Sequence, residues 1–156
     1  MDKSGLDSVA VGQRFSFSKT VGESDVYAFA GITGDFSDTH VNAQYMKEKS
    51  NLGERIAHGA LLVGFMSTAS TRSIEHVIHQ PDLVDFPVSA GYDRLRFLRP
   101  VRFGDTVTVQ YAVTSVDRER GRSIAKIECL NQNGEIVAVA EHIMRWARKL
   151  SSAPAA

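Results

Sequence analysis

The sequence predicts an α+β domain in which an antiparallel sheet wraps around one long, buried helix. Residues 57–73 carry apolar or small side chains around most of a helical circumference, as in a helix that is covered on all sides. After Pro81 the chain instead alternates apolar and polar residues in successive runs separated by turn sequences. Strands this close in sequence pair antiparallel, and the apolar helix can fill the hollow of the sheet.

The runs after Pro81 each have the length of a strand. They are separated by Phe103-Gly104-Asp105, Arg118–Gly121 and Asn131–Gly134, whose residues favour tight turns. The expected strands are Val88–Leu98, Thr106–Asp117, Ser123–Leu130 and Glu135–Ala147.

Shorter elements precede the long helix. In Arg14–Lys19, Phe15 and Phe17 alternate with serines, which predicts a first strand. A short helix capped by Ser24 is expected next, because acidic residues stand near the start of this stretch. The expected elements that follow are this helix over Asp25–Ile32, its end at Thr33-Gly34-Asp35, an irregular stretch over 35–42 and a short helix over Ala43–Lys49. This order of elements is that of the hot-dog architecture.

A chain of 156 residues has the size of one domain, and no linker or repeat divides it. We expect a hot-dog domain over 11–149, with a flexible N-terminal tail over 1–10 and a flexible C-terminal tail over 150–156. Pairing of two copies side by side would extend the sheet and cover an edge strand. A homodimer or a dimer of dimers is therefore expected.

The composition argues against some classes of partner. Lys plus Arg total 18, as do Asp plus Glu, so the chain lacks the basic excess of proteins that bind nucleic acid or anionic membranes. It shows no signal peptide and no apolar run of transmembrane length, so a cytoplasmic location is expected. Cys129 is the only cysteine, which excludes an intrachain disulfide, and its place in a strand predicts a buried, inert thiol.

Asp35 and His40 are the strongest candidates for catalysis. They lie five positions apart, so a loop can bring them together where a regular helix would not. A carboxylate can orient an imidazole or share a water with it, and either group can transfer protons near neutral pH. Taken alone, such a pair is more often a turn cap and a surface residue, so the pattern needs a second signal.

That signal is His58-Gly59 at the start of the long helix. The first N–H groups of a helix have no partner within it, and the helix dipole is positive there. Because Gly59 has no side chain, a substrate carbonyl can approach its N–H, which would stabilise an oxyanion. A glycine that only permits close helix packing is an equal alternative. His76 with His79 supplies too few ligands to predict a metal site.

The stretches Gly34–His40 and Arg55–Leu62 resemble the MaoC-like family of (R)-specific enoyl-CoA hydratases. Tyr92–Asp105 is similar to the family's central strand and turn, and the resemblance covers about residues 10–147. Asp-x4-His combined with His-Gly at this separation is specific, whereas either half alone is weak. The family usually carries Asn-Pro where this chain has Ser37-Asp38; proline would stiffen the loop, and Asp38 adds a carboxylate.

The resemblance implies roles for individual residues. Asp35 and His40 match the family's catalytic dyad, and Gly59 matches its oxyanion donor. The candidate substrate-binding residues are Ser67, which matches a hydroxyl that lines the site in some members, His58 and Arg96. Ser67 could instead serve helix packing, and His58 could form a hydrogen bond at the helix entry. Arg96, like Arg94, Arg99 and Arg102, could meet coenzyme A phosphates. The alternative for all four arginines is a strand face that is solvated or contacts a second copy.

The implied activity is reversible hydration of trans-2-enoyl-CoA to (R)-3-hydroxyacyl-CoA, with the dyad activating water. It needs no metal or redox cofactor, because coenzyme A, or the phosphopantetheine of a carrier protein, is part of the substrate. One alternative is a thioesterase on the same fold, which has no obvious need for His40 beside Asp35. The other is a non-catalytic subunit of a hot-dog heterodimer, against which the intact dyad argues.

Overall fold

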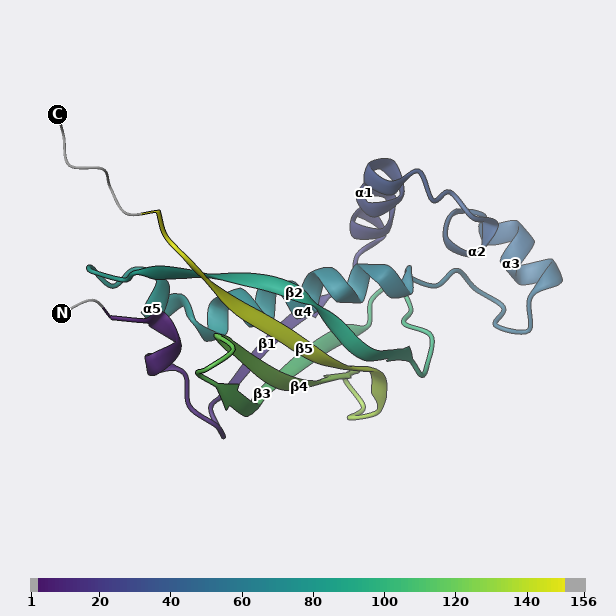
Figure 1. The fold of residues 1–156 in the computed structure, drawn as a ribbon. Coiled ribbons are helices and arrows are strands. Elements are labelled where there is room, and N and C mark those ends of the chain that lie inside the picture. The colour runs from purple at the N-terminus through teal and green to yellow at the C-terminus, as the bar shows by residue number, and fades with distance from the viewer. Residues whose placement is uncertain (1–2, 151–156) are drawn as a thin grey trace, which may run out of the picture.

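The computed structural model describes residues 3–150 and shows one sheet wrapped around a long helix (Figure 1). The elements in chain order are the 3₁₀-helix η1 (Gly5–Ser8), β1 (Arg14–Thr20), α1 (Glu23–Thr33), α2 (Asp38–Val41), α3 (Ala43–Lys49), α4 (Gly59–Ser73), α5 (Glu75–Ile78), β2 (Asp85–Phe97), β3 (Thr106–Asp117), β4 (Arg122–Leu130) and β5 (Ile136–Arg148). Among the described helices, none is long and apolar enough to cross a membrane. Apart from Leu150, the predicted C-terminal tail lies outside the described residues.

The strands form one antiparallel sheet in the order β1-β3-β4-β5-β2. Tight turns join β3, β4 and β5: Gly121 has a φ of 59°, and the Asn131 side chain accepts hydrogen bonds from the N–H groups of Asn133 and Glu135, each at 3.0 Å. The strands predicted after Pro81 are all present, with ends shifted by a few residues at most. The predicted α+β arrangement is confirmed.

β2 is an edge strand, because it pairs only with β5. The stretch Tyr92–Asp105 therefore begins at an edge of this chain's sheet and supplies no central strand, in contrast to the expectation from resemblance. Register shifts at Ser89/Gly91 and Asp93/Arg96 interrupt the pairing, and such bulges bend a strand.

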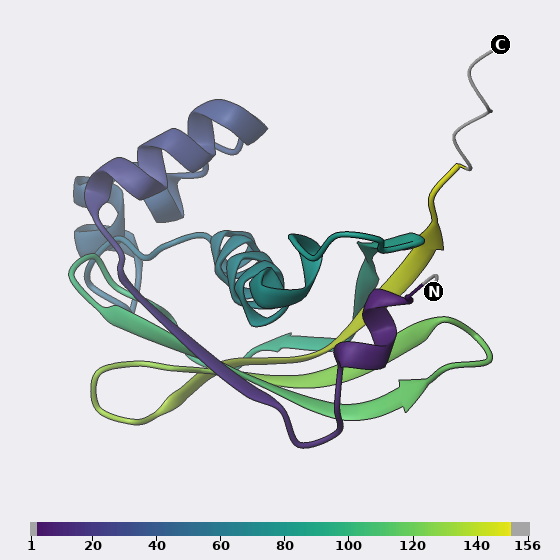
Figure 2. The ribbon, with the colours of Figure 1, turned by 90° about the vertical axis from the view of Figure 1, so that its left-hand side faces the viewer.

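α4 lies in the hollow of the sheet (Figure 2). Its buried residues are Leu62, Phe65, Met66, Ala69, Ser70 and Ser73. Phe65 meets Phe17 of β1 edge to face, with ring centroids 6.4 Å apart. Ala60, Gly64 and Ser67 on the other side are exposed, so the helix is not covered all round in the single chain. These three exposed residues are small, whereas the large apolar side chains Leu62, Phe65 and Met66 point into the core.

The N-terminal stretch 1–10, expected as a flexible tail, packs against the domain over much of its described part. Leu6 and Val9 are buried in the core. η1 lies over Trp146 so closely that a Cβ on Gly5 would come within 2.0 Å of the indole ring. These residues therefore belong to the domain.

α1, α2 and α3 form an arm that extends beyond one end of the sheet (Figure 1). The residue before α1 is Gly22 and the expected cap, Ser24, lies inside the helix, because the Asp25 carboxylate closes the first turn by accepting the Gly22 N–H at 2.8 Å. As predicted, the helix ends before Gly34, whose φ of 81° is the left-handed conformation that glycine adopts easily.

Arg55 connects this arm to the body of the domain. Its guanidinium forms an ion pair with Glu23 at 2.6 Å and donates to the Tyr27 hydroxyl at 3.2 Å, both on α1. The same group lies 4.8 Å above the centre of the Phe103 ring, in the turn before β3. One side chain thus fixes the start of the arm to the scaffold.

Candidate active site

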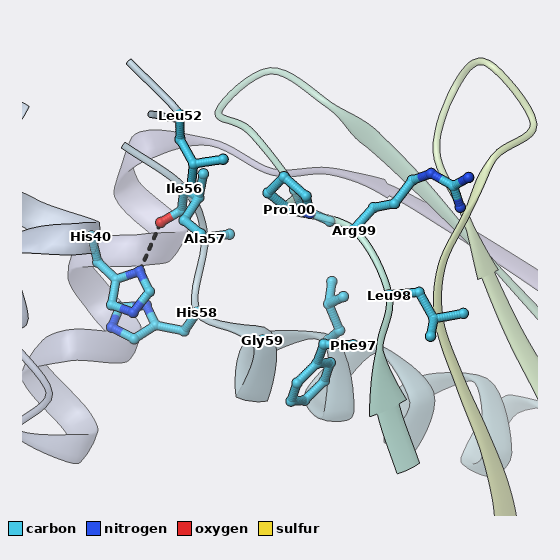
Figure 3. A pocket seen from close by; sticks show the side chains of 12 residues that line it. His40, Leu52, Ile56, Ala57, His58, Gly59, Phe97, Leu98, Arg99 and Pro100 are labelled. Carbon is cyan, nitrogen blue, oxygen red and sulfur yellow. Dashed lines mark hydrogen bonds between the residues drawn. The ribbon is translucent and has the colours of Figure 1, made fainter. Parts of the chain in front are cut away.

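A cavity of about 360 Å³ lies where the arm meets the start of α4 and the end of β2 (Figure 3). Most of its wall is apolar, from Leu52, Ile56, Ala57, Leu62, Phe97, Leu98, Pro100 and Val101. Its remaining wall comes from His40, His58, Gly59 and Arg99. An apolar cavity with a few polar groups is the usual form of a small-molecule site.

His40 reaches the cavity from α2, a single turn of helix in the stretch expected to be irregular. The turn follows Ser37 and is closed by Asn42, whose side chain donates to Asp38 at 2.9 Å. His40 Nδ1 lies 2.8 Å from the Ile56 carbonyl and must carry the proton there, because a carbonyl oxygen only accepts (Figure 3). In the neutral ring this leaves Nε2 free to accept a proton from a water.

Asp35 follows α1, and its side chain is 54% exposed. The Ser37 N–H donates to Asp35 Oδ1 at 3.3 Å, so the carboxylate closes a short turn with its own main chain. One oxygen of this carboxylate and one ring nitrogen each of His40 and His58 lie within 4.8 Å of one another. The structure thus brings the predicted pair together and adds His58, and one water can bridge groups at such distances.

His58 is the residue before α4, and its side chain is only 2% exposed. Its Nε2 donates to the main-chain carbonyl of Asp35 at 2.9 Å and lies 3.9 Å from the Asp35 carboxylate. Its ring stacks on that of His40, with centroids 3.7 Å apart and planes inclined by 29° (Figure 3). Phe29 of α1 packs against it at 4.8 Å.

Gly59 begins α4, so its N–H has no acceptor within the helix, and it makes no other hydrogen bond within residues 3–150. Because Gly59 also lines the cavity, this donor is available beside it. The positive end of the α4 dipole adds to the attraction for a negative oxygen. A free N–H in such a position can donate to a negatively charged oxygen.

Asp35, His40 and His58 offer ligand types that zinc binds, but their arrangement does not fit a metal ion. The lone pairs of imidazole lie in the ring plane, and the nearly parallel, stacked rings direct them side by side. They would have to converge on one point about 2 Å away to bind zinc. Proton transfer is the chemistry that this arrangement suits.

A family model of the MaoC-like domain matches residues 8–133, which is most of the chain. The chain belongs to the MaoC-like domain family. An (R)-specific enoyl-CoA hydratase of Rhodospirillum rubrum is 37% identical over 116 residues, covering 74% of this chain and 73% of the relative. A 3-hydroxybutyryl-CoA dehydratase of Methylorubrum extorquens is 31% identical over 153 residues, covering 97% and 89%.

Similarity to a solved structure supports the same family and fold. The R-hydratase PhaJ1 from Pseudomonas aeruginosa, in its unliganded form, superposes with a TM-score of 0.76 at 27% identity, covering 97% of this chain and 94% of that one. The relatives named as hydratase and dehydratase are hydro-lyases. The predicted family and the hot-dog fold are confirmed.

In this MaoC-like chain, Ser67 and Arg96 lie outside the cavity lining. Ser67 is on the exposed side of α4, and the Arg96 guanidinium folds back to donate to the Leu95 carbonyl at 2.7 Å. The arginine at the cavity is Arg99, which donates to the Ile136 carbonyl at 2.9 Å. The other arginines considered for coenzyme A phosphates form ion pairs, Arg94 with Glu141 and Arg102 with Glu54.

Phe97 and Leu62 border the MaoC-like cavity but do not stand out in the sequence. Alternation in β2 indicates a strand without showing that its last residue reaches the start of α4. Gly59 does signal a close approach there, because a Cβ on it would lie 2.7 Å from the Phe97 ring. The sequence does not tell whether substrate or another side chain makes that approach.

A second polar cluster lies in the core and joins the strands β2, β3 and β5. The His142 side chain is fully buried, with Nε2 2.9 Å from the Ser89 hydroxyl and Nδ1 3.0 Å from the Tyr111 hydroxyl. Burial lowers the pKa of His142 to about 4, in line with a structural residue. Burial also raises the pKa of the Cys129 thiol to about 12, which makes that thiol unreactive.

Proposed function

We propose that this protein catalyses the reversible hydration of a trans-2-enoyl-CoA to the (R)-3-hydroxyacyl-CoA. The observation that supports it most strongly is the meeting of three groups. His40, with its free Nε2, and Gly59, with its unpaired N–H, line one cavity, and a carboxylate oxygen of Asp35 lies within 4.8 Å of a His40 ring nitrogen. The handedness and the coenzyme A thioester are taken from the named hydratase relatives.

Hydration begins with a water held between Asp35 and His40. As the water oxygen attacks the β carbon of the enoyl group, His40 Nε2 takes one of its protons. The Asp35 carboxylate accepts the other hydrogen of the water and so aims the oxygen lone pair. The bond from His40 Nδ1 to the Ile56 carbonyl keeps the ring oriented during the transfer.

The electrons displaced from the carbon–carbon double bond move onto the thioester oxygen, giving an enolate. The Gly59 N–H donates to this oxygen, and removing one such donor typically costs about 3–4 kcal/mol of transition-state stabilisation. The proton held by His40 then passes to the α carbon, and the carbonyl re-forms. The net change is addition of one water, and the same steps reversed remove it.

The substrate itself supplies the thioester carrier. Coenzyme A, or the phosphopantetheine of a carrier protein, enters as part of the substrate, and the reaction transfers only protons and water. The proposed steps therefore use no redox cofactor and no metal ion. The apolar wall of the cavity, including Ile56, Leu62 and Phe97, suits a hydrocarbon chain.

We further propose that the protein acts as a homodimer formed through β2. This strand has one unpaired edge, and its residues Phe86 and Val88 are 45% and 43% exposed. The exposed side of α4, with the small residues Ala60, Gly64 and Ser67, is a further surface that a second copy could cover. Light scattering should give twice the mass of the chain, and Val88→Lys should shift it toward the monomer. A monomeric wild type would contradict this assembly.

Product analysis tests the proposed reaction. The wild type incubated with crotonyl-CoA should give a thioester heavier by one water, which an (R)-specific 3-hydroxyacyl-CoA dehydrogenase oxidises and an (S)-specific one does not. Oxidation by the (S)-specific enzyme would contradict the assigned handedness. Release of free coenzyme A in place of hydration would favour the thioesterase alternative.

A further inference from the structure

The short segment 56–59 contacts every group of the proposed site. The Ile56 carbonyl receives the His40 Nδ1–H, and Gly59 supplies the unpaired N–H at the cavity. Between them, His58 touches both His40 and Asp35. We propose that His58 is a positioning residue, whose Nε2–H fixes the main chain of Asp35 and whose ring supports the His40 imidazole. This inference rests on the proposed hydration.

The hydrogen bond to Asp35 anchors an otherwise exposed residue. Asp35 follows Gly34, and its own side chain is half exposed. The His58 Nε2–H donates to the Asp35 carbonyl at 2.9 Å. The His58 side chain is 2% exposed and packs against Phe29, so this donor cannot move away. Because the carboxylate is attached to the same main chain, this bond sets where it meets the water. A misplacement of 1 Å can cost about a hundredfold in rate.

The stacked ring supports His40 in two ways. It limits rotation of the His40 imidazole about the axis left free by the bond to Ile56. It also presents an aromatic face at 3.7 Å to a ring that becomes positively charged when Nε2 takes the proton of the water. The face of an aromatic ring is its negative part and attracts a cation.

His58 does not itself transfer protons in this arrangement. Its Nε2–H is engaged by the Asp35 carbonyl, since that oxygen only accepts. Its Nδ1 is buried and makes no hydrogen bond to any group within residues 3–150. A buried nitrogen is poorly placed to take a proton from a water held between Asp35 and His40, so His58 acts through its two neighbours.

Two substitutions separate the two contacts. His58→Gln retains a side-chain N–H that can reach the Asp35 carbonyl but removes the ring, whereas His58→Phe retains the ring and removes the donor. The full-length protein would be assayed with crotonyl-CoA for kcat and KM. His76→Gln, on exposed α5, makes the same chemical change away from the site and should behave as the wild type.

Each variant should lower kcat by about 10- to 100-fold while KM changes by less than about threefold. A role in folding alone would leave the rate per folded molecule unchanged, so a fall in kcat at nearly constant KM reports the placement of Asp35 and His40.

Several results would overturn the inference. A kcat equal to that of the wild type in either folded variant would remove the positioning role, and a raised KM with unchanged kcat would make His58 a substrate contact only. Nitrogen NMR of the wild-type imidazoles needs no variant: it should find the proton on Nε2 of His58 and on Nδ1 of His40, and the opposite tautomer of His58 would refute the contact. A wild type that does not hydrate crotonyl-CoA would instead count against the proposed function.

Discussion

The Phe97 ring occupies the space that any side chain at residue 59 would need. A Cβ added to Gly59 would lie 2.7 Å from Phe97 Cδ2, inside the distance at which two carbons can remain. Phe97 ends β2 and Gly59 begins α4, so this contact joins the sheet edge to the proposed oxyanion donor. The absence of a side chain is required by the packing as well as by the proposed chemistry.

Gly59→Ala should therefore lower both stability and activity. Displacing Phe97 should cost about 1–3 kcal/mol in the free energy of unfolding, the usual range for an overpacked site. The displaced ring and the new methyl group should also crowd the Gly59 N–H and lower kcat at least about tenfold. Urea unfolding and initial rates measure the two effects separately.

The same substitution in a Phe97→Ala background is the matched control. With the ring removed, alanine at the start of a helix should be neutral or stabilise by about 0.5–1 kcal/mol, because it restricts the unfolded chain. The double-mutant cycle would then give a coupling energy of the size expected for residues in contact. Additive effects of the two substitutions would show that the contact does not limit residue 59.

His40→Ala should reduce kcat by about 10²- to 10⁴-fold, because it removes the proposed base. Asp38→Asn is the control: Asp38 lies on the same helix, but its carboxylate bonds the Asn42 side chain at 2.9 Å. The Asp38→Asn variant should have a kcat within about twofold of the wild-type value. If Asp38→Asn were the damaging change and His40→Ala were tolerated, the proposed base would be wrong.

Arg55→Ala should loosen the arm that carries Asp35 and His40. The ion pair with Glu23 is largely exposed on the Glu23 side, so its loss should cost no more than about 1 kcal/mol of global stability. Hydrogen exchange should nevertheless rise in α1 and α2, and kcat/KM should fall about tenfold as the dyad loses its placement. Arg102→Ala, which removes another surface ion pair near the arm, should change neither hydrogen exchange in α1 and α2 nor kcat/KM.

Stability should fall in mild acid because of His142. Its pKa is lowered from 6.5 to about 4 by burial, so between these values the unfolded chain binds a proton that the folded chain does not. The contribution is absent above about pH 6.5, grows as pH falls and reaches about 3 kcal/mol of lost stability near pH 4. His142→Gln should be less stable at neutral pH, because the Tyr111 and Ser89 contacts change, yet its stability should depend less on pH. Urea titrations from pH 7.5 to 4.5 give the comparison, and parallel curves would count against His142.

Much of the fold could be predicted because local patterns determine it. The alternation in β3, β4 and β5, the turn residues between them and the apolar helix α4 each predicted the correct element. The N-terminal stretch differs from its prediction because the burial of Leu6 and Val9 depends on contact with distant residues such as Trp146. No local pattern encodes such a contact.

The candidate site divides in the same way. Spacing and residue type single out Asp35, His40 and Gly59. In the structure Asp35 lies beside His40, and His40 and Gly59 line the same cavity. Residue type on a strand favours Arg96, but β2 is interrupted by bulges, and the arginine that lines the cavity is Arg99, in the turn after β2. The stacking of His58 on His40 follows from how the arm folds over the body, which spacing along the chain does not reveal.

We propose that Asp35 takes part in adding water to an enoyl thioester. The most direct test is the loss of enoyl-thioester ultraviolet absorbance when the protein meets crotonyl-CoA, with Asp35→Asn measured in parallel and free thiol assayed in both. Asp35→Asn preserves shape at an exposed position, so its unfolding curve should match that of the wild type within about 0.5 kcal/mol. We expect rapid loss of absorbance without thiol release in the wild type and at least about a hundredfold slower loss in the variant. Equal rates in the two folded proteins, or thiol release by the wild type, would refute a role for Asp35 in hydration.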